Sequence, residues 1–160
     1  MQSANRTLRL FLDDEAATIA TARSLAAVLP TGGFVVALRG PLGAGKSSFA
    51  RAVLQALGVS GAVPSPTYTL IEPYATERGT AYHVDLYRLR EPEEVQALGL
   101  DELAADAALI LVEWPERGGD GALAFDLALE FDYADSARSL SARALTTAGE
   151  RVLGAWEATP

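Results

Sequence analysis

The chain contains 160 residues, 49% of them hydrophobic, and carries a formal net charge of −8 at pH 7. This length and hydrophobic content predict one domain, residues 1–160, with its own core, and so acidic a chain is a poor candidate for binding nucleic acid unaided. The absence of cysteine excludes disulfides, thiol catalysis and cysteine-ligated metal, and the single histidine, His83, excludes any site that needs two.

The first part of the chain predicts a strand followed by a helix. Residues 8–12 form a short, mostly apolar run of strand length, and Asp13 or Asp14 can cap the helix that follows. Pro30-Thr31-Gly32-Gly33 ends that helix. Its buried face is predicted by a stripe at helical spacing, namely Ile19, Ala22, Leu25, Ala26 and Leu29.

The next unit carries the most informative motif. Residues 33–39 form a mostly apolar run that predicts a buried strand, and residues 47–57 show helical spacing before Gly58 stops the helix. Between the two, Gly40-Pro41-Leu42-Gly43-Ala44-Gly45-Lys46-Ser47 matches the G-x-x-x-x-G-K-[ST] pattern of a phosphate-binding loop. Backbone N–H groups of such a loop and the positive end of its helix point at one place, where anionic phosphates can sit.

The phosphate-binding loop contains the only lysine of the chain. Lys46 is the only lysine among 13 basic residues, and the others are all arginine. A slim ammonium group reaches the β- and γ-oxygens of a polyphosphate inside a tight loop, where a planar guanidinium would not fit. We therefore expect the Lys46 side chain to be exposed to a phosphate pocket.

Strands and short helices alternate through the rest of the chain. The predicted strands are 67–74, 80–89, 108–114, 125–133 and 139–145, and the predicted helices are 91–98 and 101–107. A turn at residues 76–79 joins the first two of these strands into a hairpin. Interleaved strands and helices predict an α/β layer architecture with antiparallel strands added at the edges of the sheet.

No part of the sequence is typical of a membrane or export segment. The longest purely apolar run, residues 107–112, is far too short to span a bilayer. No basic-then-apolar signal segment opens the chain. We therefore expect a cytoplasmic protein.

Two acidic residues each end an apolar strand. Asp85 follows Tyr82-His83-Val84, and Glu113 follows Leu109-Ile110-Leu111-Val112. Nucleotide-hydrolysing enzymes hold Mg²⁺ with a hydroxyl such as that of Ser47 and usually a carboxylate, and they also need a group that orients the attacking water. Asp85 and Glu113 each fit either role.

Two further segments have both a functional and a structural interpretation. Residues 65–69 (Ser-Pro-Thr-Tyr-Thr) lie where other nucleotide hydrolases keep a segment that senses the γ-phosphate, but they also suit a plain turn. Trp114, directly after Glu113, is either an aromatic contact for a partner at the mouth of the site or a cap on the core.

Taken together, four segments resemble the TsaE (YjeE) family of bacterial tRNA threonylcarbamoyladenosine biosynthesis ATPases. The matching segments are residues 40–49, 65–74 (SPTYTLIEPY), 83–89 (HVDLYRL) and 111–116 (LVEWPE). Their order and spacing match, and the resemblance covers nearly the whole chain, with the tail beyond Leu145 matching least. The chain departs from the family at Pro41, where the family usually has aspartate, and at Ser47 and Ser48, where it usually has threonine.

The resemblance implies a P-loop NTPase-like three-layer fold with a mixed central sheet. It also implies Mg²⁺-dependent ATP hydrolysis that supports N6-threonylcarbamoylation of adenosine 37 in tRNA, beside a transferase subunit and a non-catalytic dimerisation subunit. By position, Gly43, Ala44, Gly45, Lys46, Ser47 and Ser48 would cradle the phosphates, with Ser47 ligating the metal.

The resemblance also implies roles for residues outside the loop. Glu113 would be a metal-side carboxylate and Asp85 the other acid of the metal and catalytic site. Thr67 would lie in the switch-like segment. Glu15 and Arg138 fall where the family approaches the nucleotide base.

Two rival functions remain open. A small-molecule kinase would carry an arginine-bearing lid and an acceptor pocket; Arg88 and Arg90 are adjacent candidates, but no lid-like insertion is visible. A non-hydrolytic, nucleotide-dependent scaffold would keep Lys46 and Ser47 but would not need both carboxylates.

Overall fold

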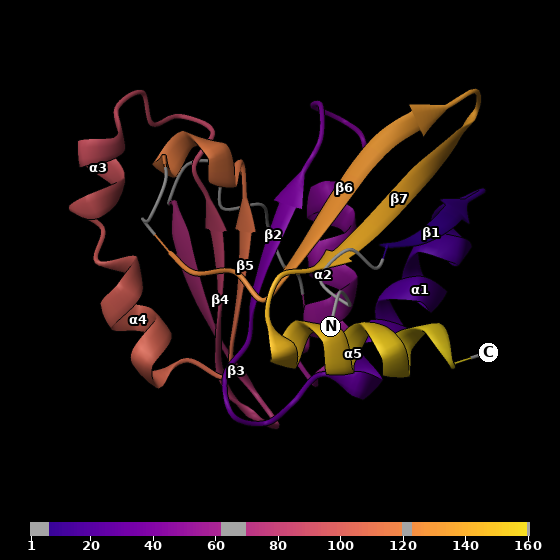
Figure 1. Cartoon of the computed structure of the whole chain (residues 1–160), viewed down its shortest axis with the longest axis horizontal. Helices are drawn as coiled ribbons and strands as arrows, with labels where there is room; N and C mark the ends of the chain where they lie inside the picture. Colours follow the sequence, from indigo (N-terminus) through magenta and orange to yellow (C-terminus); the bar gives the residue numbers. More distant parts are fainter. Residues whose placement is uncertain (1–6, 62–69, 120–122, 160) are drawn as a thin grey trace.

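The computed structural model describes residues 7–61, 70–119 and 123–159. Over these residues seven strands form one sheet in the order β1-β7-β6-β2-β5-β4-β3, flanked by helices (Figure 1). The strands are β1 (Thr7–Leu12), β2 (Val35–Arg39), β3 (Ile71–Thr76), β4 (Gly79–Asp85), β5 (Leu109–Glu113), β6 (Leu127–Ala134) and β7 (Ala137–Ala144). The helices are α1 (Glu15–Val28), α2 (Lys46–Ala56), α3 (Pro92–Gln96), α4 (Leu100–Asp106), the 3₁₀ turn η2 (Pro115–Gly118) and α5 (Thr147–Glu157).

The centre of the sheet is parallel and its edges are antiparallel. β2 runs parallel to both β5 and β6, and β4 runs parallel to β5. The β3–β4 hairpin adds an antiparallel strand on one side, and the β6–β7 hairpin with β1 beside β7 adds antiparallel strands on the other. This mixed, layered α/β architecture confirms the predicted fold class.

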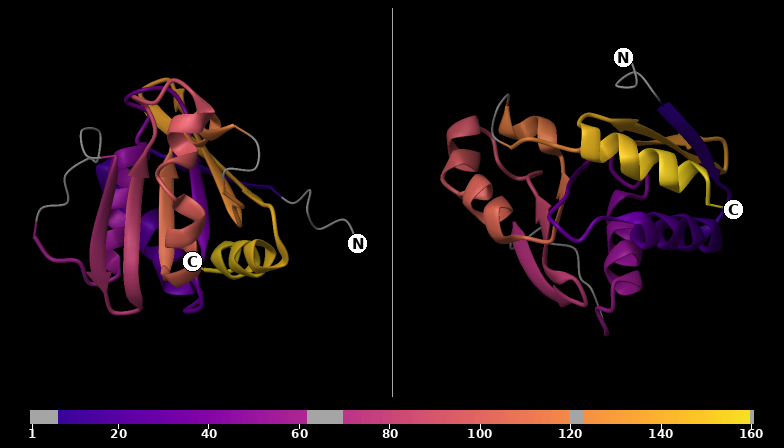
Figure 2. Two further views of the ribbon diagram at one scale, coloured as in Figure 1. Left: turned by 90° about the vertical axis from the view of Figure 1, so that its left-hand side faces the viewer. Right: turned by 60° about the horizontal axis from the view of Figure 1, so that its bottom comes forward.

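Helices cover the sheet through two separate apolar clusters. α1, α2 and α5 contribute side chains to the larger cluster, where Phe49 of α2 packs edge-on against Phe131 of β6 with ring centroids 5.4 Å apart. Val95 and Leu100, from α3 and α4, belong to the smaller cluster over β4 and β5. Figure 2 shows α3 and α4 set apart from α1, α2 and α5. The interior strand β5 contributes side chains to both clusters, which explains why all five of its residues are buried.

Most predicted elements are confirmed, with three differences. The predicted strand 80–89 ends at Asp85, because the chain then turns: the Tyr87 amide donates to the Asp85 side chain and the Leu89 amide to the Leu86 carbonyl. Ile19 is 37% exposed rather than buried, and the buried face of α1 consists of Ala22, Leu25 and Ala26. α5 was not predicted at all. Of the two candidate caps, Asp14 is the one whose side chain accepts from the Ala17 amide.

Part of one predicted strand lies outside the described residues. β3 begins at Ile71, and residues 67–69 of the predicted strand 67–74 are not described. Within the described parts of the chain, no helix has both the length and the apolar character that crossing a membrane requires.

Candidate functional site

The predicted phosphate loop joins the end of β2 to the start of α2. Gly40 has φ of 140°, and a Cβ added there would lie 2.4 Å from the carbonyl oxygen of Phe131. Gly45 has φ of 111° and caps α2. Both positions require glycine, since the left-handed region penalises other residues. The loop thus has strand, turn and helix in the order that a phosphate site needs.

A cavity of about 240 Å³ lies beside this loop. It is lined by the loop and by the ends of β4 and β5. The lining residues are Leu42, Gly43, Gly45, Lys46, Ser47, Ser48, Asp85, Tyr87, Glu113 and Trp114. The structure therefore brings the predicted loop residues and both predicted carboxylates to one place. Ala44 does not line the cavity: its side chain is buried, and its amide donates to the Pro41 carbonyl.

Ser47 and Glu113 are in direct contact. The Ser47 Oγ lies 2.9 Å from Oε1 and 2.8 Å from Oε2 of Glu113, so the hydroxyl donates to this carboxylate. Glu113 is only 2% exposed. Its Oε2 atom also forms a hydrogen bond with the His83 ring, whose Nε2 lies 2.7 Å away. A hydroxyl and a carboxylate in contact provide the hard oxygen atoms that Mg²⁺ prefers.

Asp85 stands next to Glu113 on the neighbouring strand. The two residues are paired in the parallel register of β4 and β5. The Oδ1 atom of Asp85 accepts a hydrogen bond from the Tyr87 amide at 2.9 Å. Because parallel strands end at the same edge of a sheet, two acids at strand ends converge on the loop.

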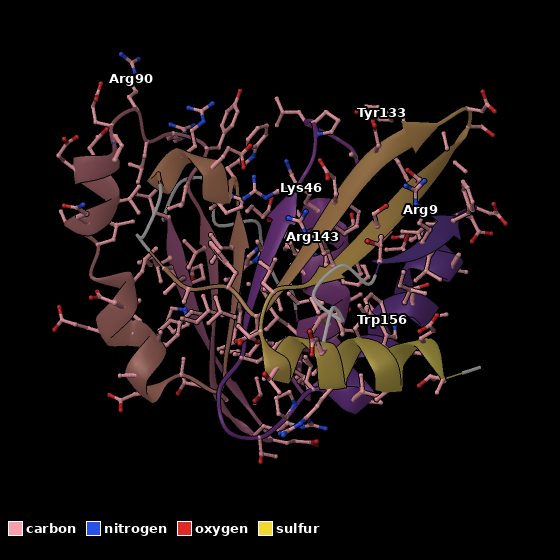
Figure 3. All side chains as sticks on the ribbon, viewed as in Figure 1. Arg9, Lys46, Arg90, Tyr133, Arg143 and Trp156 are labelled. Carbon is pink, nitrogen blue, oxygen red and sulfur yellow. The ribbon has the colours of Figure 1, made fainter. Side chains whose placement is uncertain are left out.

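Lys46 is more enclosed than the sequence predicted. The side chain is only 4% exposed, because the ring of Trp114 covers it with the ammonium nitrogen 3.6 Å from the ring centroid. The ammonium also donates to the carbonyl of Gly40. Burial lowers the pKa of Lys46 below its ordinary value, and the nearby carboxylates of Glu113, Glu116 and Asp85 oppose that shift. Figure 3 shows Lys46 near the end of β2 where the loop begins.

A second cavity, of about 310 Å³, lies on the other side of the loop. Glu15 and Arg138 both line it, together with Asp14 and Thr18 of the α1 region. Gly43, Gly45 and Ser48 border this cavity as well as the first one, so the two cavities adjoin. The Arg138 guanidinium stacks on the ring of Tyr133 at 4.7 Å from its centroid. The two residues assigned to the base by resemblance therefore lie together beside the loop.

Sequence reasoning missed the role of His83 and left two interpretations of Trp114 open. His83 was assigned no role in the site from the sequence, although residues 81, 83 and 85 alternate along β4 and this spacing places His83 on the same face as Asp85. Trp114 adopts a left-handed backbone with φ of 59°, and its ring lies 5.0 Å from that of Tyr87. Thr67 lies outside the described residues.

Comparison with known proteins identifies the family. The model of the family described as "Threonylcarbamoyl adenosine biosynthesis protein TsaE" matches residues 12–143. The chain belongs to the TsaE family. The resemblance inferred from the four segments is thereby confirmed.

Curated TsaE proteins from other bacteria support this assignment. The tRNA threonylcarbamoyladenosine biosynthesis protein TsaE of Haemophilus influenzae is 39% identical over 122 residues, covering 76% of this chain and 77% of that protein. The Aquifex aeolicus TsaE is 38% identical over 110 residues, covering 68% and 77% of the two chains. The crystal structure of YdiB from Bacillus subtilis superposes with a TM-score of 0.77 at 27% identity and 95% coverage of both chains.

Proposed function

We propose that this TsaE-family protein is a Mg²⁺-dependent ATPase that supports N6-threonylcarbamoylation of adenosine 37 in tRNA. It would act in the cytoplasm, where its tRNA substrate resides, with a transferase subunit and a non-catalytic dimerisation subunit. The observation that carries the hydrolase proposal is the Ser47–Glu113 contact beneath the phosphate loop, beside Lys46 and Asp85.

The loop and its two adjoining cavities suit a nucleoside triphosphate. The phosphates would lie at the N-terminus of α2, where backbone amides and the helix dipole favour anions. The Lys46 ammonium would exchange its contacts with Trp114 and Gly40 for phosphate oxygens. The cavity of Glu15 and Arg138 would receive the base and ribose.

The residues present fit Mg²⁺ as the cofactor. Magnesium is commonly held by one or two protein oxygen atoms, with substrate phosphates and water completing its shell. We assign Ser47 as the protein ligand, with Glu113 holding that hydroxyl and Asp85 close by. When bound, the metal would neutralise charge on the phosphate oxygens.

The geometry of the site also favours different roles for Glu113 and Asp85. Both oxygens of Glu113 are engaged with Ser47, and one of them also with His83, so Glu113 serves the metal side. Asp85 lines the same cavity from the next strand, so we assign it to orient the attacking water. A non-hydrolytic scaffold would not need both acids, and their pairing favours hydrolysis.

The test is phosphate release from ATP by the purified chain, alone and with the transferase and dimerisation subunits. We expect Mg²⁺-dependent release that the partners change and that Lys46→Ala removes. ATP binding with no release under either condition would favour the scaffold. Release that depends on a small-molecule acceptor, with the phosphate recovered on that acceptor, would favour the kinase.

A further inference from the structure

We propose that His83 is a positioning residue, which fixes the Glu113 carboxylate beneath the phosphate loop so that this carboxylate holds the Ser47 hydroxyl. The proposal rests on the proposed function, because it assigns His83 to the metal side of the same site. His83 does not itself line the cavity, and its hydrogen bond to the site is to Glu113, which does.

One carboxylate oxygen connects the three side chains. The Oε2 atom of Glu113 lies 2.7 Å from His83 Nε2 and 2.8 Å from Ser47 Oγ. His83 comes from β4, Glu113 from β5 and Ser47 from α2, so the contact ties three elements together. The rotation of a carboxylate held on both sides is restricted, and its direction toward the loop is set by the histidine.

In the hydrogen bond between His83 and Glu113, the ring is the donor and the carboxylate is the acceptor. Nδ1 of His83 is buried and has no hydrogen-bond partner among the described residues. A carboxylate can only accept, so Nε2 carries the proton and donates it to Glu113. In the neutral ring, the tautomer that forms this bond leaves Nδ1 as a bare lone pair. A buried N–H at Nδ1 would instead leave a donor unsatisfied.

The burial of His83 argues against a purely structural role. The side chain is 1% exposed, on the face of the sheet that packs against the larger apolar cluster. An imidazole with one unsatisfied nitrogen costs about 1–3 kcal/mol there, and an aliphatic side chain would avoid that cost. The contribution that only the ring makes is the hydrogen bond to Glu113.

Loss of this bond should weaken the response to Mg²⁺. Outer residues that orient metal-side groups typically change metal affinity or activity by about 10- to 100-fold. We expect His83→Leu to raise the Mg²⁺ concentration needed for half-maximal tightening of a fluorescent ATP analogue by about 10-fold or more. Binding of the analogue without Mg²⁺ should stay close to wild type, because the loop itself is unchanged.

Two variants and a coupling experiment separate positioning from packing. His83→Gln keeps an N–H donor at a similar reach and should restore much of the Mg²⁺ response. In a Glu113→Gln background, His83→Leu should add little further loss, since His83 acts through Glu113. Tyr74→Phe is the matched control, because the Tyr74 hydroxyl is likewise buried without a partner among the described residues but lies on the edge strand β3.

The imidazole can also be observed directly by ¹⁵N NMR without nucleotide. His83 is the only histidine, so its ring signals need no assignment. We expect the proton on Nε2 and a change in that signal on Glu113→Gln substitution. A proton on Nδ1, or a His83→Leu variant with the Mg²⁺ response of the wild type, would overturn the proposal. Failure of the proposed function is distinguishable, since wild-type protein would then release no phosphate from ATP, with or without partners, while the NMR result obtained without nucleotide stays intact.

Discussion

Lys46 decides whether the loop works as proposed. The side chain is enclosed by the loop and by Trp114, so neither a shorter nor a broader side chain can make the same contacts. We expect Lys46→Ala to abolish hydrolysis and weaken ATP binding, and Lys46→Arg to fail to rescue, because guanidinium is too wide for the loop. Phosphate release and binding of a fluorescent nucleotide measure the two effects, and circular dichroism checks folding. Wild-type hydrolysis by Lys46→Arg would contradict this account of the loop.

Substitutions of the carboxylates of Asp85 and Glu113 should affect hydrolysis in different ways. Asp85→Asn and Glu113→Gln should each reduce hydrolysis by about 10²-fold or more, as expected for a positioned acid or metal-side group. Only Glu113→Gln should also shift the Mg²⁺ requirement, since Glu113 is the acid in contact with Ser47. Initial rates across a Mg²⁺ titration measure both effects.

Glu116→Gln is the matched control for these substitutions. Its side chain is 44% exposed and pairs loosely with Arg39 at 4.0 Å, so it should leave the rate within about twofold of wild type, in keeping with the small effects of exposed pairs. An unchanged rate for Asp85→Asn or Glu113→Gln would remove that residue from the site.

The sequence predicted those parts of the site whose positions follow directly from the order of residues along the chain. The loop residues are contiguous, and Asp85 and Glu113 end strands of one sheet, so their convergence follows from parallel pairing. The enclosure of Lys46 could not be predicted. It depends on the left-handed turn at Trp114, a conformation that local sequence does not specify for a tryptophan.

At the scale of elements, α5 is the part of the fold that sequence reasoning missed. Its sequence places Gly149 and Gly154 inside a helix, where glycine lowers helix propensity. Tertiary contacts compensate, because Val152, Leu153 and Trp156 are all buried in the larger core cluster. The helix begins at Thr146, whose hydroxyl accepts from the Gly149 amide and donates to Asp126, the residue that also receives the Val35 amide at the start of β2.

Close packing at the start of α5 gives a prediction for stability. A Cβ added at Gly149 would lie 1.9 Å from the carbonyl oxygen of Asp126. Gly149→Ala should therefore destabilise the protein by about 1–3 kcal/mol, although alanine is the better helix former. Chemical denaturation measures the change in the free energy of unfolding.

Gly32→Ala provides the control for this experiment. A Cβ at Gly32 would meet no atom within 4 Å, so we expect little change in stability. Equal stability of Gly149→Ala and wild type would mean that α5 starts differently from the structure described here.

For the whole molecule, the net charge and the residues of the site together predict that the function of this chain depends on partner proteins. The net charge is −8, and the only lysine is enclosed in the phosphate loop. The 12 arginines are outnumbered by 21 acidic residues, so the field of the whole chain opposes contacts with an RNA backbone, which normally supply much of the affinity for nucleic acid. Arg117, which stacks near Tyr87 and Trp114, donates to the Leu89 carbonyl rather than into the loop. An arginine that a partner protein supplies to stabilise charge in the transition state can raise turnover by about 10³-fold or more.

We therefore predict that the isolated chain binds tRNA poorly, hydrolyses ATP slowly and is captured by the transferase–dimerisation complex in an ATP-dependent way. Leu42 at the tip of the loop is 60% exposed, so a partner that senses bound nucleotide can reach the loop directly. Filter binding with tRNA at moderate salt and a pull-down with the partner complex test both parts, with Lys46→Ala as the control that should lose capture. Tight, salt-sensitive tRNA binding by the isolated chain, without ATP-dependent capture, would show that the nucleic acid rather than the protein partners completes this site.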